Sequence, residues 1–337
     1  MSTDTTPNAP LAPWLQTQLS TLLAQRGHAW LLQGASGLGQ YELGLALVAA
    51  WLCEQATPQG ACGQCPGCHM LRARTHPDVC VLMPETDMLE LGWPLSEKAQ
   101  SDIDDKKRKP SKEIRVDAMQ AATEFAQRTS ARGRGKAVLV YPAERMNHVA
   151  ANALLKTLEE PAGDLKFALS SEAAHQLLPT IRSRCLTHPM LWPDAAQSAN
   201  WLATQGQGAA AAELLAAAGG RPQAALAMAA AGMTAAAWAQ IPKAASSGNA
   251  ASFSGWAPSQ VLDALQKLCH DALAVLCGAQ PRFFAAADMP RARSVAALGR
   301  WAQALVQSAR HIEHPYKSEL LTEALVSQAQ QALHSSK

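Results

Sequence analysis

The sequence predicts an α/β domain with a parallel sheet, followed by two all-helical domains. Up to about Pro193, short apolar runs alternate with segments of helical periodicity, which is typical of a parallel sheet covered on both faces. Beyond that residue the chain is rich in alanine, and no strand pattern of comparable strength follows. The expected domains comprise residues 1–190, 191–241 and 242–337.

Length and composition limit the class of protein. A chain of 337 residues suits two or three domains, and a formal net charge of +2 argues against a strongly basic nucleic-acid binder taken as a whole. No apolar stretch approaches the roughly 20 residues that span a bilayer. Residues 1–12 are polar and contain no apolar signal-peptide core. We therefore expect a cytoplasmic protein without a membrane partner.

The first elements are predicted around a glycine-rich segment. Residues 28–33 form an apolar run that stops at Gly34-Ala-Ser-Gly-Leu-Gly39, and helical spacing follows from Tyr41 to Trp51. This order indicates a strand, a glycine loop and a helix. Residues 79–83 form a second apolar run.

The same alternation continues along the chain. Residues 114–129 have helical spacing, and residues 136–141 are a candidate buried strand. Asn147 is placed to cap the next helix, which Pro161 ends. Residues 167–171 form one more short strand.

Two other stretches are defined by charge and by helix breakers. Residues 86–112 are charged and include the basic run 106–109, but acidic neighbours favour a mobile, solvated insertion over a nucleic-acid patch. The sequence assigns this insertion no role. The helical remainder has predicted breaks, which are Gly219-Gly220, Pro242, residues 246–248, Gly278 and Pro290.

Four of the eight cysteines are clustered, with the spacing Cys53-x8-Cys62-x2-Cys65-x2-Cys68. Without a secretory signal, such a cluster indicates metal binding rather than disulfides. Four thiolates close the tetrahedral shell of Zn²⁺ and leave no position for a catalytic water, so we expect one structural Zn²⁺. An iron–sulfur cluster, a metal-free cluster and competition from His69 remain as alternatives.

The glycine-rich segment has the spacing of a P-loop without its chemistry. Its glycines are Gly34, Gly37 and Gly39. A working P-loop continues with a lysine for the phosphates and a hydroxyl for Mg²⁺, but here Gln40 and Tyr41 follow. Tyr141 and Pro142 follow the later strand where an acidic residue is needed, and Glu144 is displaced by several residues. We therefore expect no productive binding of ATP.

Taken together, these features resemble a known family. The cysteine cluster after a degenerate P-loop, the run Asn152-Ala-Leu-Leu-Lys-Thr-Leu-Glu-Glu-Pro161 and the segment Ile181-Arg-Ser-Arg-Cys185 resemble delta-prime subunits of the bacterial DNA polymerase III clamp loader, which are AAA+ proteins. The similarity is strong from Trp14 to Leu186. It is weaker beyond, where the layout and Ser318-Glu-Leu-Leu321 support it.

The resemblance implies a function in DNA replication. In clamp loaders, five AAA+ subunits open a sliding clamp and place it on primed DNA, with ATP bound at subunit interfaces. The chain would be a subunit of the DNA polymerase III holoenzyme, a nucleotidyltransferase complex, without intrinsic activity. Its partners would be ATPase motor subunits and delta in a hetero-oligomer, and through them the clamp and primed DNA. The segments 191–241 and 242–337 would be a small lid and an oligomerising collar.

The resemblance also implies roles for single residues. Arg184 matches the family's arginine finger, which acts in trans on the ATP of a neighbouring subunit. Ser183 and Cys185 would support that loop, and the cysteines of the knuckle at 53–68 match the family's zinc ligands.

Further positions match motor subunits only partly. Ser170 falls near a γ-phosphate-sensing position, while Gln223 replaces a second sensing arginine and Arg221 is offset by two residues. Three other interpretations remain: an unrelated α/β protein with a glycine-rich turn, an active P-loop NTPase that uses Gln40, and a knuckle that binds DNA or RNA. The last is weak, because residues 58–69 contain no lysine or arginine for phosphate contact.

Overall fold

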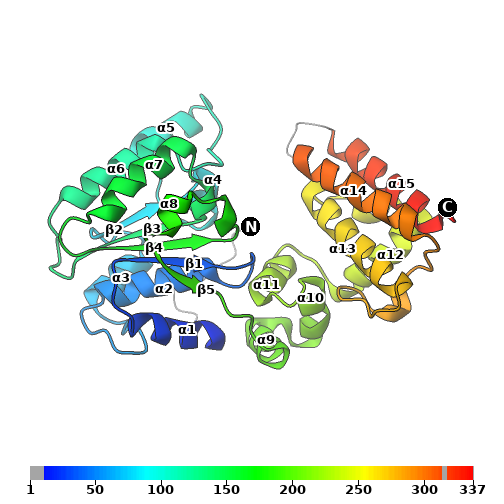
Figure 1. Ribbon diagram of the computed structural model, residues 1–337, viewed down its shortest axis with the longest axis horizontal. Coiled ribbons are helices and arrows are strands. Elements are labelled where there is room, and N and C mark those ends of the chain that lie inside the picture. The colour runs from blue at the N-terminus through cyan, green and yellow to red at the C-terminus, as the bar shows by residue number, and fades with distance from the viewer. Residues whose placement is uncertain (1–10, 313–316, 337) are drawn as a thin grey trace. The chain divides into compact units, whose positions relative to one another are not determined.

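The computed structural model describes residues 11–312 and 317–336, and most of the polar segment 1–12 lies outside the described residues (Figure 1). The chain divides into two compact units, Met1–Gln197 and Ser198–Lys337. The first contains the predicted α/β domain. The described part of the second is helical.

The first unit is built on a five-stranded sheet in the order β2-β3-β4-β1-β5, and every pair of neighbours is parallel. The strands are β1 Ala29–Gln33, β2 Val79–Leu82, β3 Lys136–Val140, β4 Leu165–Ser171 and β5 Leu186–Pro189. The predicted parallel sheet is confirmed. Sequence reasoning missed β5, because this edge strand is largely exposed and lacks an apolar run.

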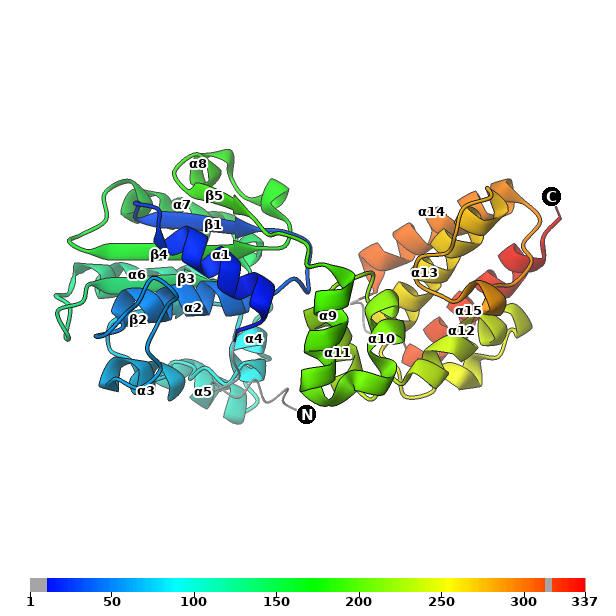
Figure 2. The ribbon, with the colours of Figure 1, turned by 90° about the horizontal axis from the view of Figure 1, so that it is seen from below.

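Helices lie on both faces of this sheet. The packing of α1 and α2 on one face and α6 and α7 on the other is visible in Figures 1 and 2. The α-helices of the unit are α1 Pro13–Leu23, α2 Gln40–Leu52, α3 Pro66–Arg72, α4 Glu85–Glu90, α5 Glu97–Asp104, α6 Val116–Gln127, α7 His148–Glu159 and α8 Pro179–Arg182. Because helices cover both faces of the sheet, the sequences of β1 and β3 are continuous apolar runs and do not alternate between apolar and polar residues.

A buried lysine of the sheet, Lys136, binds the C-terminal end of α6. Lys136 begins β3 and is only 6% exposed. Its Nζ donates to the carbonyl of Phe125 at 3.0 Å and to those of Ala126 and Arg128, at the end of α6. Burial lowers the pKa of Lys136. These carbonyls would otherwise lack partners at the C-terminus of the helix, so the lysine caps α6.

Helix α7 begins and ends where the sequence predicts. The Asn147 side chain accepts a hydrogen bond from the Ala150 N–H at 2.8 Å, which is the predicted cap. The helix ends at Glu159, two residues before Pro161.

The segment 86–112 differs from the predicted mobile insertion. It contains most of α4 and all of α5. The Arg108 guanidinium binds the Glu85 carboxylate, with Nη2 at 2.7 Å from Oε1, and holds the pKa of Glu85 below its usual range. The Ser111 N–H donates to the same carboxylate at 2.7 Å. These contacts join the residue before the segment, Glu85, to the end of the segment at Arg108 and Ser111.

Within residues 198–312 and 317–336, the second unit is built of helices. They are α10 Ala211–Ala217, α11 Pro222–Ala230, α12 Ala235–Ser247, α13 Pro258–Leu276, α14 Val295–His311 and α15 Ser318–His334, while α9 Ala195–Leu202 begins before the boundary. Two apolar clusters lie within the unit. The smaller is centred on Leu214 and Leu215 of α10, and the larger joins α12 to α15.

The predicted break at Pro242 is wrong, since α12 runs through this residue and ends at Ser247, where Gly248 caps it with a φ of 73°. A proline inside a helix removes one backbone hydrogen bond. Here Trp238, Ile241 and Ala245 of the same helix are buried, and this burial offsets the loss. The expected domain limit at 241/242 therefore falls within a continuous helix.

No single described helix is long and apolar enough to cross a membrane; α11 and α12, bent by 88°, pass that test only as a pair.

A buried carboxylate organises one loop of the second unit. Asp271 of α13 is completely buried. Its oxygens accept hydrogen bonds from the backbone N–H groups of Arg282 (2.9 Å), Phe283 (2.7 Å) and Phe284 (3.0 Å). The Phe284 ring stacks on Trp238 with 4.8 Å between centroids. The loop after α13 is thus fixed to two helices.

Replacing Asp271 with alanine should therefore destabilise the chain by about 3 kcal/mol, because three backbone N–H groups, of which that of Phe284 is buried, lose their acceptor. Urea unfolding of the full chain, followed by tryptophan fluorescence, measures this loss. Asp288→Ala, at an exposed position, is the matched control. Equal midpoints for the two variants would show that the loop does not depend on this carboxylate.

Candidate metal centre and degenerate nucleotide site

The four clustered cysteines converge at the end of α2. Cys53 directly follows α2, Cys65 caps α3, Cys68 lies within α3, and Cys62 is in the intervening loop. Their sulfur atoms all lie within 4.8 Å of one another, and those of Cys53 and Cys65 are 3.8 Å apart. The predicted set is therefore brought together in space and could hold a metal ion. His69 is exposed and does not belong to this group.

Backbone N–H groups point at these sulfur atoms. Cys62 N donates to Cys53 Sγ at 3.2 Å, Cys65 N to Cys62 Sγ at 3.3 Å, and Cys68 N to Cys65 Sγ at 3.4 Å. The N–H groups of Gln64 and Cys65 lower the pKa of the Cys62 thiol. Hydrogen bonds that stabilise thiolates suit a cation bound only by sulfur.

The glycine loop keeps the backbone form of a phosphate-binding loop. It joins β1 to α2, and Gly37 and Gly39 have φ values of 78° and 98°. A Cβ atom at Gly39 would lie 2.6 Å from Leu15 Cδ1 of α1. Glycine is therefore required there both by the backbone conformation and by the close approach of α1.

Gln40 occupies the loop with its own side chain. The residue is only 2% exposed, and its Nε2 donates to the carbonyls of Gly34 at 3.0 Å and Ala35 at 2.6 Å. The Ser170 hydroxyl, which is also buried, donates to the Gln40 carbonyl at 3.0 Å. The two residues that the sequence analysis compared with phosphate-contacting positions, Gln40 and Ser170, thus bond to the protein itself.

Tyr41 is likewise tied to the protein. Its hydroxyl accepts a hydrogen bond from Trp93 Nε1 at 2.8 Å, and its ring lies 5.3 Å from that of Tyr141. The Arg74 guanidinium lies over the Trp93 ring at 4.4 Å. Burial raises the pKa of Tyr41. Sequence reasoning missed Trp93 and Arg74, because nothing local links them to the loop.

The acidic side chains near the end of β3 have structural contacts. Tyr141 follows β3, and its hydroxyl lies 3.4 Å from Glu172 Oε1. Burial raises the pKa of Tyr141. Glu144 Oε1 accepts a hydrogen bond from the backbone N–H of Glu172 at 3.1 Å. Glu144 therefore holds the chain after β4, in agreement with its displacement from the expected acidic position.

Arg184 lies on the loop after α8 with a side chain that is 34% exposed. Its Nη1 donates to the Thr180 carbonyl at 2.9 Å, and its Nη2 pairs with Glu159. The Ser183 hydroxyl donates to the same carbonyl at 3.1 Å. Burial raises the pKa of Cys185 to about 11, so its thiol is unreactive at neutral pH.

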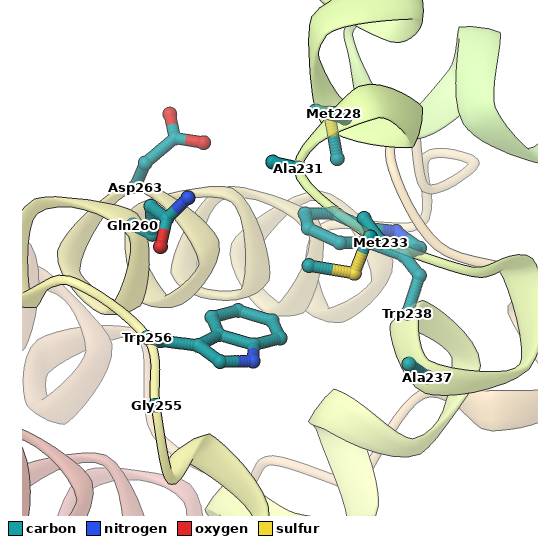
Figure 3. Close-up of a pocket in the computed structure, with 10 residues that line it drawn as sticks. Met228, Ala231, Met233, Ala237, Trp238, Gly255, Trp256, Gln260 and Asp263 are labelled. Atoms are coloured by element: carbon teal, nitrogen blue, oxygen red, sulfur yellow. The ribbon is translucent and has the colours of Figure 1, made fainter. Parts of the chain in front are cut away.

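Some predicted positions and one pocket lie in the second unit. Gln223 is in the first turn of α11, and Arg221 donates from Nε to the Ala218 carbonyl at 2.7 Å. This unit also has a pocket of about 160 Å³. Figure 3 shows Trp238, Trp256 and Met233 among the residues that line it. None of the predicted site residues lines this pocket.

Comparisons with known proteins agree with this arrangement. The model of the family described as "DNA polymerase III, delta subunit" matches residues 13–191. The DNA polymerase III subunit delta' of Pseudomonas aeruginosa is 41% identical over 219 residues, which are 64% of this chain and 60% of that protein. The subunit delta' of Escherichia coli is 35% identical over 198 residues, 57% of this chain and 52% of that protein. The chain thus matches between half and two thirds of these relatives' length.

A solved structure supports the fold alone. The DNA polymerase III gamma subunit-related protein of Thermotoga maritima superposes with a TM-score of 0.52 and 15% identity, covering 95% of this chain and all of that one. The first unit therefore has the AAA+ fold with its parallel sheet, and the helical second unit follows it in the sequence. Since the family match covers more than half of the sequence, the chain belongs to the delta-prime family of DNA polymerase III subunits.

Proposed function

We propose that this chain is a non-motor subunit of the clamp loader, without an ATPase site of its own, that supplies Arg184 to the ATP site of a neighbouring motor subunit. In a hetero-oligomer with motor subunits and delta, it helps load the sliding clamp onto primed DNA in the cytoplasm. The observation that carries the proposal is the Gln40 amide, which bonds to the loop carbonyls of Gly34 and Ala35 in place of a phosphate-binding lysine.

The loss of the lysine alone weakens phosphate binding. A hydrogen bond to a charged group contributes roughly 1.5–3 kcal/mol, which corresponds to about one to two orders of magnitude in affinity. Mg²⁺ binding suffers as well, because the Tyr41 hydroxyl is engaged by Trp93. The residues that replace the catalytic ones thus have partners of their own, which supports a permanently silent site.

The position of Arg184 supports a role in trans. Its loop is fixed by Ile181, which is completely buried, while the guanidinium remains partly exposed. A guanidinium can neutralise the charge that develops on a transferred γ-phosphoryl group. Ser183 and Cys185 support the loop without taking part in the reaction.

The metal and the domains complete the proposal. We assign a structural Zn²⁺ to Cys53, Cys62, Cys65 and Cys68, since four thiolates leave no open coordination position. Residues 1–190 form the degenerate AAA+ domain with the knuckle at 53–68. Residues 191–241 form the lid and 242–337 the collar. The smaller apolar cluster lies within the first of these segments, whereas the larger one also includes Trp238 and Ile241 of α12.

The purified chain should contain one zinc per molecule, and Cys65→Ser should remove it and lower the melting temperature, because metal affinity is part of the folding free energy. Elemental analysis and thermal unfolding test this. Cys277→Ser, at an exposed cysteine outside the cluster, should keep the metal. Iron in place of zinc would favour the iron–sulfur alternative, and a metal-free chain of unchanged stability would exclude a structural metal.

The isolated chain should neither hydrolyse ATP nor bind it tightly. We expect its affinity for Mg-ATP to be at least about tenfold below that of a motor subunit measured alongside, because Gln40 supplies no charge. Nucleotide titration and phosphate release are the measurements. Mg-dependent turnover that disappears in Gly39→Ala or Gln40→Ala would instead identify an active NTPase.

Arg184→Ala should leave folding, metal content and assembly intact but lower the clamp- and DNA-stimulated ATPase of the reconstituted complex by about 10³-fold, since the finger acts on transition-state charge. ATP binding by the neighbour should change little. Arg184→Lys should restore only part of the rate, because an ammonium group lacks the planar set of N–H donors of a guanidinium. Arg182→Ala, at an exposed neighbouring arginine, is the control. Equal rates for Arg184→Ala and wild type would show that Arg184 is not the arginine finger.

A further inference from the structure

The Arg184 side chain is held against its own subunit by three groups. Nη2 pairs with Glu159 Oε1, while Nη1 donates to the Thr180 carbonyl at 2.9 Å and lies 3.5 Å from Ser183 Oγ. In the part of the chain that the structure describes, Nε makes no hydrogen bond. A guanidinium has five N–H donors, so Nε and one N–H of Nη2 stay available to another acceptor.

Glu159 occupies an unusual place for an acidic residue. It is the last residue of α7, where the carbonyl ends of the helix carry partial negative charge and disfavour a carboxylate. The Arg184 guanidinium supplies the compensating positive charge. The neighbouring Glu160 is also exposed, but no ion pair with it is formed within the described residues.

Both partners of this ion pair are attached to the same apolar cluster. Leu158, which precedes Glu159, is 1% exposed, and Ile181, three residues before Arg184, is completely buried; both belong to the cluster between the sheet and α7. The His28 ring adds a contact of 2.9 Å between Nε2 and the Leu158 carbonyl. The carboxylate and the arginine loop are therefore carried on rigid supports, which is the condition for a preorganised functional group.

We propose that Glu159 is a positioning residue that orients the Arg184 guanidinium toward an acceptor outside this chain. The inference rests on the proposed role of Arg184 as a finger. Glu159 and the Thr180 carbonyl fix the plane of the guanidinium, so that its Nε and remaining Nη2 hydrogens point together at an incoming phosphate. An arginine free of this contact would populate many rotamers and would spend less time in the productive one.

The test uses clamp-loader complexes reconstituted with the full chain carrying Glu159→Gln, which removes the charge and keeps the shape. We expect kcat for ATP turnover to fall about threefold to tenfold, as for the loss of a partly exposed ion pair that orients a catalytic group. KM for ATP should not change, because the guanidinium acts on charge that develops in the transition state. Glu160→Gln, with the same loss of charge one residue away, should behave as wild type.

A double-mutant cycle separates positioning from a general effect on the subunit. Glu159→Gln should have no further effect in a complex that already carries Arg184→Ala, and the melting temperature of the chain should stay that of Glu160→Gln. A rate equal to or above wild type, a loss that adds to that of Arg184→Ala, or an equal loss in Glu160→Gln would each overturn the inference. If Arg184→Ala itself leaves the rate unchanged, Arg184 is not an arginine finger, and both the proposed function and this inference are wrong. If Arg184→Ala lowers the rate strongly and Glu159→Gln does not, only the positioning role of Glu159 is refuted.

Discussion

Parallel strands all end at the same edge of a sheet, and in this protein that alignment sets what can meet at the glycine loop. The register pairs Leu32 with Ser170, so the end of β4 lies beside the end of β1. The Ser170 hydroxyl then reaches the Gln40 carbonyl in the first turn of α2. Gly44 of the same helix permits this approach, because a Cβ atom there would lie 2.7 Å from Ser170 Oγ. Close packing of α2 on the sheet therefore determines the geometry of the loop.

The backbone of the glycine loop and the contacts of the side chains that follow it depend on different residues. Gly37 and Gly39 set the backbone, and the apolar strands set the sheet. Gln40 and Tyr41 affect only the side chains that would meet phosphate and Mg²⁺. Each makes a new internal contact, with the loop carbonyls and with Trp93 respectively. The backbone of the loop therefore does not depend on which side chains follow its last glycine.

The cysteine cluster and Arg184 both lie at the ends of helices that pack on this sheet. Cys53 directly follows α2, so the rigid helix positions the first sulfur atom. The loop after α8 is attached through Ile181 to the apolar cluster that also holds α7. Asp78 strengthens the region near the knuckle, because its carboxylate accepts from the N–H groups of Ala131 and Arg132 at 2.7 and 2.9 Å. The largely buried cysteines and the partly exposed Arg184 are thus both carried by buried supports.

The sequence by itself determined the features that depend on near neighbours. Periodicity identified the alternation of strands and helices, Asn147 identified a cap, and the cysteine spacing identified the sulfur cluster. The contact of Trp93 with Tyr41 joins residues 52 positions apart, and that of Arg184 with Glu159 joins residues 25 apart. Only the packing of the sheet decides such pairs, since no local pattern records them. The continuity of α12 through Pro242 likewise depends on the buried face of the helix, whereas the proline taken by itself predicts a break.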